Sequence, residues 1–308
     1  RVGHRTLIEG EGPLRVGEGP VRTGVTVIIP REEPWKHPAY AGSHRLNGNG
    51  ELTGLSWVRE SGQLMGPIGL TNTHSVGVVR DGLIRHEVKV RRDEFFFSLP
   101  VVGETCDGLL NDINGFHVKA EHVEEAIEAA SAGPVEEGNV GGGTGMICHG
   151  FKGGIGTASR KVPDASGGYT VGLLVQTNHG MRERLAVNGV AVGRELDGDQ
   201  VPMPDFTPVM PPGSGSIIGI VATDAPLIPT QCERLAQRIG LGIARMGGAG
   251  EHGSGELFFC FANGNDSMPS DFDQKSDLTA PVSMLANRVI NDLFYATVEA
   301  TEEAILNS

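Results

Sequence analysis

The stretch from Gly247 to Asn263, GGAGEHGSGELFFCFAN, constrains the fold of this chain more than any other. Its second half, Leu257 to Phe261, is short, apolar, aromatic and bounded by turn-forming residues, which is typical of a buried β-strand. Its first half is rich in glycine and ends at Ser254, which stands between Gly253 and Gly255. The chain must therefore build a core around this strand and keep a glycine-rich loop at its entrance.

Ser254 has two interpretations. Glycine neighbours leave the serine hydroxyl open on both flanks and let a carbonyl approach it, including the carbonyl of Gly253. The alternative is a surface hairpin loop, because Gly, Ser and Asn dominate loops for conformational reasons. The stretch alone favours the loop. Residues 248–253 match GxGxxG in the wrong context for a dinucleotide site, and His252 breaks the nucleophile-elbow pattern GxSxG.

Composition describes an ordinary globular protein with unusual loops. The chain has 308 residues, of which 39% are apolar and 20% charged, a length that allows one large domain or two smaller ones; we expect a single domain over residues 1–308. It has 46 glycines, about twice the roughly 7% background share. They cluster in a few segments, which indicates several tight loops that converge on one place.

Charge and cysteine usage exclude several classes of function. A formal charge of −13 disfavours nucleic acid and anionic membranes as partners, and no apolar run has the length of a transmembrane helix. The four cysteines lie far apart without CxxC spacing, so we expect reduced, buried thiols and no metal site. The expected location is the cytoplasm, or the periplasm if an N-terminal signal was removed.

Hydrophobic patterns predict a mixture of strands and long helices, and hence α/β layers built on mixed or antiparallel sheets. Ala41–Gly54 is rich in polar and turn-forming residues, which predicts a connecting loop or a pocket wall. Asn265–Pro281 is polar and acidic and is expected to be a surface insertion. The clearest helices are Val118–Ala132, Pro229–Arg245 and Asn291–Ser308, and the clearest strands are Val25–Ile29, Tyr169–Thr177, Leu185–Val192 and Ser216–Asp224.

A nucleophilic serine needs a base for its proton and donors for the developing oxyanion. The chain has ten histidines, but no spacing singles one of them out as the base. A second route is cleavage of the Gly253–Ser254 bond. Cleavage would give Ser254 a free α-amine with an ordinary pKa near 8, which can act as the base for its own hydroxyl.

Several long motifs carry a family resemblance across nearly the whole chain, in the order GSHRLNGNGELTGLSWV, PIGLTNTHSVGVV, ETCDGLLNDING, EGNVGGGTGMICHGFKGGIGTASR, ATDAPL and HGSGELFFCFAN. Together they resemble the self-processing D-aminopeptidase and β-aminopeptidase family. That family includes L-aminopeptidase/D-amidase-esterases and is related in fold to ornithine acetyltransferases. The resemblance implies a four-layer αββα sandwich of the self-processing N-terminal-nucleophile type.

The resemblance also implies roles for individual residues. Ser254 matches the nucleophile, and the Gly253–Ser254 bond matches the cleavage site, which would give an α part of residues 1–253 and a β part of residues 254–308. Glu137, in the EGNVG motif, matches the residue that holds the ammonium group of the substrate. The alternative for Glu137 is an exposed loop acid.

Four further residues are implied by the resemblance. Thr301 and Glu303 match a hydroxyl-x-Glu pattern that supports the nucleophile, although their spacing on a helix puts them on diverging faces, so a solvated helix face is the rival interpretation. His149 occupies a position often held by a tyrosine that contacts the reacting carbonyl. Asn178, which ends a buried strand, is a candidate contact for the oxyanion or the substrate.

The sequence thus predicts a self-cleaving serine aminopeptidase or amidase that acts on small peptides, amides or esters with a free amino group. Family members release D-, L- or β-amino acids, use no metal or organic cofactor and assemble as homo-oligomers, so we expect the same here, with a tetramer or a larger assembly. Two alternatives are an acyltransferase with the same nucleophile and a non-catalytic binding protein on the same fold.

Overall fold

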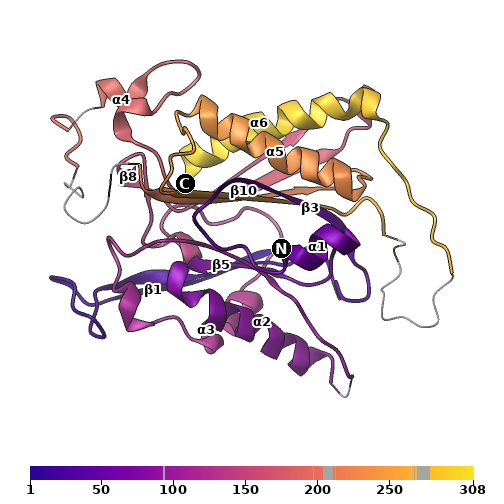
Figure 1. Ribbon diagram of the computed structural model, residues 1–308, viewed down its shortest axis with the longest axis horizontal. Helices are drawn as coiled ribbons and strands as arrows, with labels where there is room; N and C mark the ends of the chain where they lie inside the picture. The colour runs from indigo at the N-terminus through magenta and orange to yellow at the C-terminus, as the bar shows by residue number, and fades with distance from the viewer. Residues whose placement is uncertain (93, 197, 204–210, 212, 267, 269–277) are drawn as a thin grey trace.

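Two stacked β-sheets form the centre of the molecule, and helices cover the outer face of each sheet (Figure 1). The structure is a computed structural model that describes residues 1–92, 94–196, 198–203, 211, 213–266, 268 and 278–308. From top to bottom in Figure 1 the layers are a helix pair, a sheet, a second sheet and a second helix pair. This order confirms the predicted four-layer αββα sandwich.

The four-stranded sheet has the strand order β1-β2-β5-β6, in which only β5 and β6 run parallel. Helix α2 connects these two parallel strands and packs on the outer face of the sheet together with α3. The bounds are β1 Val2–Glu9, β2 Val21–Ile28, β5 Ile68–Asn72, β6 Val101–Thr105, α2 Val76–Val90 and α3 Ala120–Glu128.

The six-stranded sheet has the order β4-β3-β12-β11-β10-β9, so β12 lies near its middle. Strands β11 and β12 are parallel and are connected by α5, which covers the outer face of the sheet with α6. The bounds are β3 Ala39–Gly48, β4 Gln63–Leu64, β9 Ile155–Lys161, β10 Thr170–Asn178, β11 Gly215–Thr223, β12 Ser254–Ala262, α5 Pro229–Arg245 and α6 Ile290–Asn307. The shorter elements are α1 Leu55–Ser61, α4 Val192–Glu195, β7 Ile147–Cys148 and β8 Phe151–Lys152.

Side chains of β12 alternate between two apolar layers, as the period of two in a strand requires. Leu257 and Phe259 face the other sheet, whereas Phe258 and Cys260 face α5 and α6. Ser254 has the parity of the second set, so its side chain points to the helix side of the sheet.

Most of the predicted elements are present, and the helix predicted over Pro229–Arg245 has those bounds in the structure. Two predictions were wrong. Residues 41–48 belong to β3 and are not a loop, because Ala39, Ala41 and Ser43 are buried at alternate positions against the rest of the sheet.

The structure also has no strand over residues 185–192, where one was predicted. A single bridge joins Val187 to Val190, and Asn188 and Gly189 between them have φ values of 50° and 80°. An Asn-Gly pair with positive φ at both positions makes a tight reversal, so the chain turns here and does not extend. The predicted surface insertion at residues 265–281 falls mostly outside the described residues.

Candidate active site

Ser254 is the first residue of β12, the strand that the sequence placed at the centre of the core. Its side chain is buried, with 1% of its surface exposed, and its neighbour Gly255 pairs with Gly48 of β3. A Cβ added to Gly255 would lie 2.3 Å from the carbonyl oxygen of Asn49, so the chain after β3 passes directly over this glycine. The glycine after the serine is therefore required by the close approach of residues 48–50.

The carbonyl of Gly253, immediately before the serine, receives a hydrogen bond. The Asn49 side chain donates from Nδ2 to the Gly253 oxygen at 2.8 Å. The amide of Ser254 donates to the Glu251 carbonyl at 2.9 Å, which closes a tight turn at the start of the strand. A donor to this oxygen polarises the carbonyl that Ser254 would attack in the predicted cleavage. The same donor would stabilise the negative charge formed on the oxygen.

Glu256 lies two residues beyond Ser254 on the same face of β12 and is equally buried. Burial raises the pKa of the Glu256 carboxyl, while the nearby Ser254 hydroxyl and the Asn47 side chain act in the opposite direction. Neither Ser254 Oγ nor Glu256 Oε2 makes a hydrogen bond of good geometry with any described residue. A hydroxyl and a carboxylate thus lie together in a buried place, and each has an atom that can form a further hydrogen bond.

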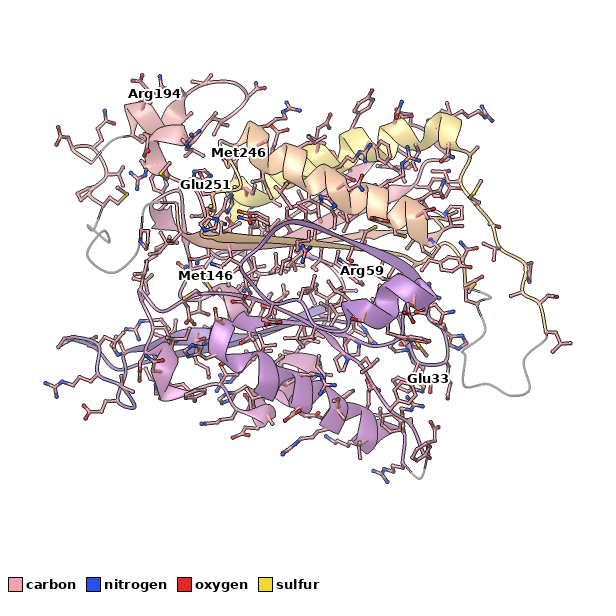
Figure 2. The ribbon with its side chains drawn as sticks, in the orientation of Figure 1. Glu33, Arg59, Met146, Arg194, Met246 and Glu251 are labelled. Atoms are coloured by element: carbon pink, nitrogen blue, oxygen red, sulfur yellow. The ribbon has the colours of Figure 1, made fainter. Side chains whose placement is uncertain are left out.

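Glu251 adds a second carboxylate to this end of the sheet, on the chain that leads to the serine. Figure 2 labels it beside Met246, on the helix side of the six-stranded sheet. Within the described residues its Oε1 atom is buried without a hydrogen-bond partner, and its charge acts on the His149 ring.

The structure places His149 near this group, and its predicted contact with the reacting carbonyl stays a prediction. Nδ1 of His149 lies 3.2 Å from the carbonyl oxygen of Met181, and because a carbonyl only accepts, Nδ1 carries the proton. Burial lowers the pKa of His149, so Nε2 carries a lone pair and has no proton to donate.

The Asn178 side chain makes two hydrogen bonds to the main chain. Its Oδ1 accepts from the amide of Ile147 at 3.0 Å, and its Nδ2 donates to the carbonyl of Cys106 at 2.9 Å. Both ends of the amide are therefore used to join main-chain segments. The side chain positions β7 against β10, and its predicted contact with an oxyanion or the substrate stays a prediction.

Thr301 and Glu303 make contacts with other residues in the structure, and their predicted support of the nucleophile stays a prediction. The Thr301 hydroxyl donates to the carbonyl of Thr297 at 2.7 Å, inside α6. Glu303 is half-exposed and pairs with Arg160 of β9 at 2.5 Å. The rival interpretation, a solvated helix face, holds for Glu303, and Thr301 is a buried helix residue.

Glu137 is not brought to Ser254 within one chain. Its Oε1 accepts from both the amide and the hydroxyl of Thr157 on β9, at 2.7 and 2.6 Å. Strand β9 lies three strands from β12, and Thr157 is level with Phe259 in the sheet register. Strand spacing and rise then separate Thr157 from Ser254 by roughly 20 Å.

Sequence reasoning missed Asn49 and Glu256. The first lies in the LNGNG segment, which was identified only as a possible pocket wall. Glu256 carried a usable signal, because a carboxylate two residues after the serine shares its face of the strand. Asn49 carried none, since only the pairing of β3 with β12 brings it to Gly253.

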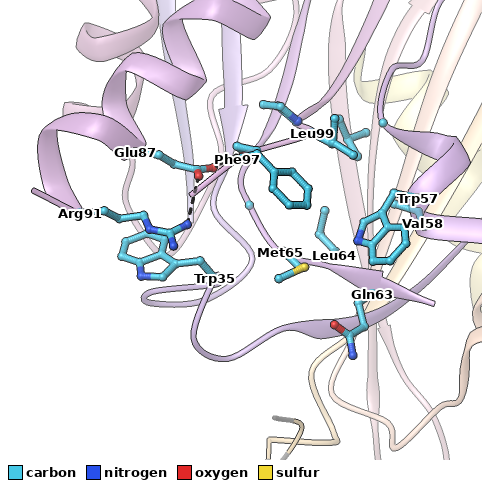
Figure 3. Close-up of a pocket in the computed structure, with 15 residues that line it drawn as sticks. Trp35, Trp57, Val58, Gln63, Leu64, Met65, Glu87, Arg91, Phe97 and Leu99 are labelled. Atoms are coloured by element: carbon cyan, nitrogen blue, oxygen red, sulfur yellow. Dashed lines mark hydrogen bonds and ion pairs between the residues drawn. The ribbon is translucent and has the colours of Figure 1, made fainter. Parts of the chain in front are cut away.

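A separate cavity lies at the far edge of β4 and contains none of the predicted site residues (Figure 3). Trp35, Trp57 and Phe97 supply its aromatic walls, and a buried ion pair joins Arg91 to Glu87 at 3.7 Å.

A serine that opens a central strand, in two stacked sheets covered by helices, defines a hydrolase with the N-terminal-nucleophile type of fold. The model of peptidase family S58 matches residues 1–308. The chain belongs to this family and is therefore a peptidase.

Related proteins agree with this assignment. The chain is 49% identical to the β-peptidyl aminopeptidase BapA of Sphingosinicella microcystinivorans over 99% of its own length and 78% of that protein. It superposes on a β-aminopeptidase of Burkholderia sp. with a TM-score of 0.91 and 52% identity, covering 100% of this chain and 83% of the other.

A third relative is the L-aminopeptidase D-Ala-esterase/amidase of Ochrobactrum anthropi, described as a prototype of the serine aminopeptidases and a variant of the Ntn hydrolase fold. The TM-score is 0.89 at 41% identity, over 99% of this chain and 82% of that one. These relatives support a serine aminopeptidase or amidase and disfavour the acyltransferase and binding-protein alternatives. No helix in the described part of the chain is long and apolar enough to cross a membrane.

Proposed function

We propose that this protein is a self-cleaving serine aminopeptidase that releases N-terminal residues, β-amino acids among them, from small peptides, amides and esters. One observation carries the proposal: a buried serine opens the central strand, directly after a glycine carbonyl that holds a side-chain donor at 2.8 Å. The names of the relatives support β-amino acids as substrates.

The first step of the proposed mechanism acts on the chain itself. Ser254 Oγ attacks the carbonyl carbon of Gly253, and its proton passes to the departing Ser254 nitrogen. The bond between that carbon and the nitrogen breaks, which leaves an ester between Gly253 and the serine oxygen. Asn49 holds the carbonyl oxygen while it carries negative charge. Water then hydrolyses the ester, so that residues 1–253 end in a carboxylate and residues 254–308 begin with a free amine.

Each catalytic turnover repeats this chemistry on a substrate. The free amine of Ser254 accepts the hydroxyl proton as Oγ attacks the acyl carbon of the substrate, and the leaving amine takes that proton when its bond breaks. Water hydrolyses the acyl-enzyme and releases the amino acid. The group proposed to donate a hydrogen bond to the acyl oxygen of the substrate is the Asn49 amide. It becomes available for this once Gly253 is a chain end.

The proposed partner of the substrate ammonium group is Glu256. Its carboxylate is buried, lies on the same strand face as the nucleophile and has an Oε2 that no described residue pairs with. A carboxylate that pairs with a cation in such a place selects for a free amino end. Glu256 thereby takes the task that the family resemblance gave to Glu137.

We also propose a homo-oligomer, a tetramer or larger, located in the cytoplasm. The four cysteines are free and three of them are buried, which suits a reducing compartment. Light scattering after size-exclusion chromatography measures the assembly, and a monomer would refute that part of the proposal.

The test of the proposed function is a panel of D-, L- and β-aminoacyl amides and esters, assayed with the wild-type protein and with Ser254→Ala. We expect turnover of substrates with a free amino group, none of their N-acetylated forms, and none with the variant. A binding protein would turn over nothing. An acyltransferase would pass the acyl group to an added amine in preference to water.

A further inference from the structure

Three residues with metal-binding side chains meet on the helix side of the six-stranded sheet. Cys148 ends β7, His149 follows it, and His179 follows the last residue of β10. The amide of His149 donates to the carbonyl of His179 at 2.8 Å, which fixes the two segments together. One potential ligand atom from each of the three side chains lies within 4.8 Å of the other two, and Cys148 Sγ lies 4.0 Å from His179 Nδ1.

The His149 ring is oriented as a metal ligand is. Its Nδ1–H donates to the carbonyl of Met181, which leaves the lone pair on Nε2. That nitrogen is buried and has no hydrogen-bond partner among the residues that the structure describes. Histidines that bind metals almost always donate their other ring N–H to a carbonyl or carboxylate, which fixes the tautomer.

The His179 ring also has nitrogen atoms that could bind a metal. Its Nδ1 faces Cys148 Sγ, its Nε2 is buried with no hydrogen-bond partner among the described residues, and the two rings meet edge to face with centroids 5.2 Å apart. Buried polar atoms without partners are rare in native proteins, and a bound ion is one of the few explanations for them.

The surroundings of the two rings suit a cation. A Cβ added to Gly180 would lie 2.3 Å from the His149 ring, so this glycine makes the space that the ring occupies. The carboxylate of Glu251 lies close enough for its charge to act on the His149 ring, and Glu251 Oε1 is buried with no hydrogen-bond partner in the part of the chain that the structure describes. The cluster therefore combines one thiol, two imidazoles and a nearby negative charge.

We propose that Cys148, His149 and His179 bind a zinc ion, with a fourth position left for water or the Glu251 carboxylate. Tetrahedral zinc, with bonds of about 2.0–2.1 Å to nitrogen and 2.3 Å to sulfur, separates its ligand atoms by roughly 3.4–3.6 Å. The three side chains need to close by about 1 Å, which small rotations supply. On binding, the Cys148 thiol loses its proton to solvent and the thiolate sulfur bonds to the metal.

The site lies beside the nucleophile but does not take part in the proposed serine mechanism. A Cβ added to Gly215, which pairs with Ser254, would lie 3.0 Å from the His179 Cα. The zinc site depends on contacts among the three ligands and does not depend on the proposed function.

The test is titration of the metal-free, untagged protein with Co²⁺, which takes the same ligands as zinc and reports them by absorption. We expect one Co²⁺ per chain, a thiolate-to-cobalt charge-transfer band, and displacement of the cobalt by Zn²⁺. Cys148→Ser removes the band and His179→Gln weakens cobalt binding at least about tenfold. Cys106→Ser, a substitution of the half-buried cysteine outside the cluster, leaves both unchanged.

Two results would overturn the proposal. One is the absence of a thiolate band in the wild-type protein with one equivalent of Co²⁺, and the other is a band that survives Cys148→Ser. If Cys148→Ser does not fold, X-ray absorption of the wild-type zinc protein decides the matter. One sulfur and two imidazoles around the metal support the site, and a shell of oxygen and nitrogen without sulfur means an adventitious ion only.

Discussion

Replacing Asn49 with alanine removes the side-chain donor that lies 2.8 Å from the Gly253 carbonyl oxygen. In the proposed self-cleavage this oxygen becomes negatively charged when Ser254 attacks. Loss of one donor to such an oxyanion costs about 2.7–4 kcal/mol, or about 100- to 1000-fold in rate. Because Asn49 is exposed to water, we expect the lower end of that range for Asn49→Ala, about 100-fold.

The assay follows the conversion of newly synthesised precursor into its two parts, by cell-free translation and a denaturing gel. Asn307→Ala is the matched control, since its amide also donates to a main-chain carbonyl, that of Thr157, at an exposed position. The control is expected to process at the wild-type rate. Wild-type processing by Asn49→Ala would refute the assignment of this donor.

Three further predictions test the substrate site, the core and the electrostatics. Glu256→Gln should raise KM for aminoacyl amides about 10- to 100-fold by removing a charge-assisted hydrogen bond, whereas Glu303→Gln should leave it unchanged; equal KM values for both variants would contradict the assignment. Phe259→Ala, at the fully buried centre of β12, should cost about 3–5 kcal/mol in chemical denaturation of the unprocessed precursor, and Phe95→Ala, at a fully exposed position, should cost almost nothing. Burial raises the pKa of Asp107 to about 6 from 3.8, so its contribution to stability is complete below pH 3.8 and is lost as the pH rises to about 6. Relative to Asp107→Asn, the wild type should therefore lose about 3 kcal/mol across that window, and a flat difference between their pH–stability curves would refute this.

Much of the fold follows from local patterns in the sequence. The helix over Pro229–Arg245 begins at a proline that can occupy the first turn and shows regular apolar spacing, so both ends could be predicted. The strand at Leu257–Phe261 is apolar on both faces because both faces are covered, one by helices and one by the second sheet. These are effects of a few neighbouring residues, so they can be predicted from the sequence alone.

The site was less predictable because its members come from distant parts of the chain. Asn49 reaches Gly253, 204 residues away, only through the pairing of β3 with β12. Conversely, the hydroxyl of Thr301 is used by the carbonyl of Thr297 four residues earlier, and no sequence motif reports such competition from the main chain. The glycines around Ser254 were informative because their spacing reflects a steric requirement on the chain that passes over Gly255.

The measurement that tests the central claim most directly is the intact mass of the purified protein, for the wild type and for Ser254→Ala. We predict two polypeptides for the wild type, the smaller beginning with Ser254, and one uncleaved, inactive polypeptide for the variant. A wild-type protein that is active as a single chain, or a variant that still divides before position 254, would contradict the account.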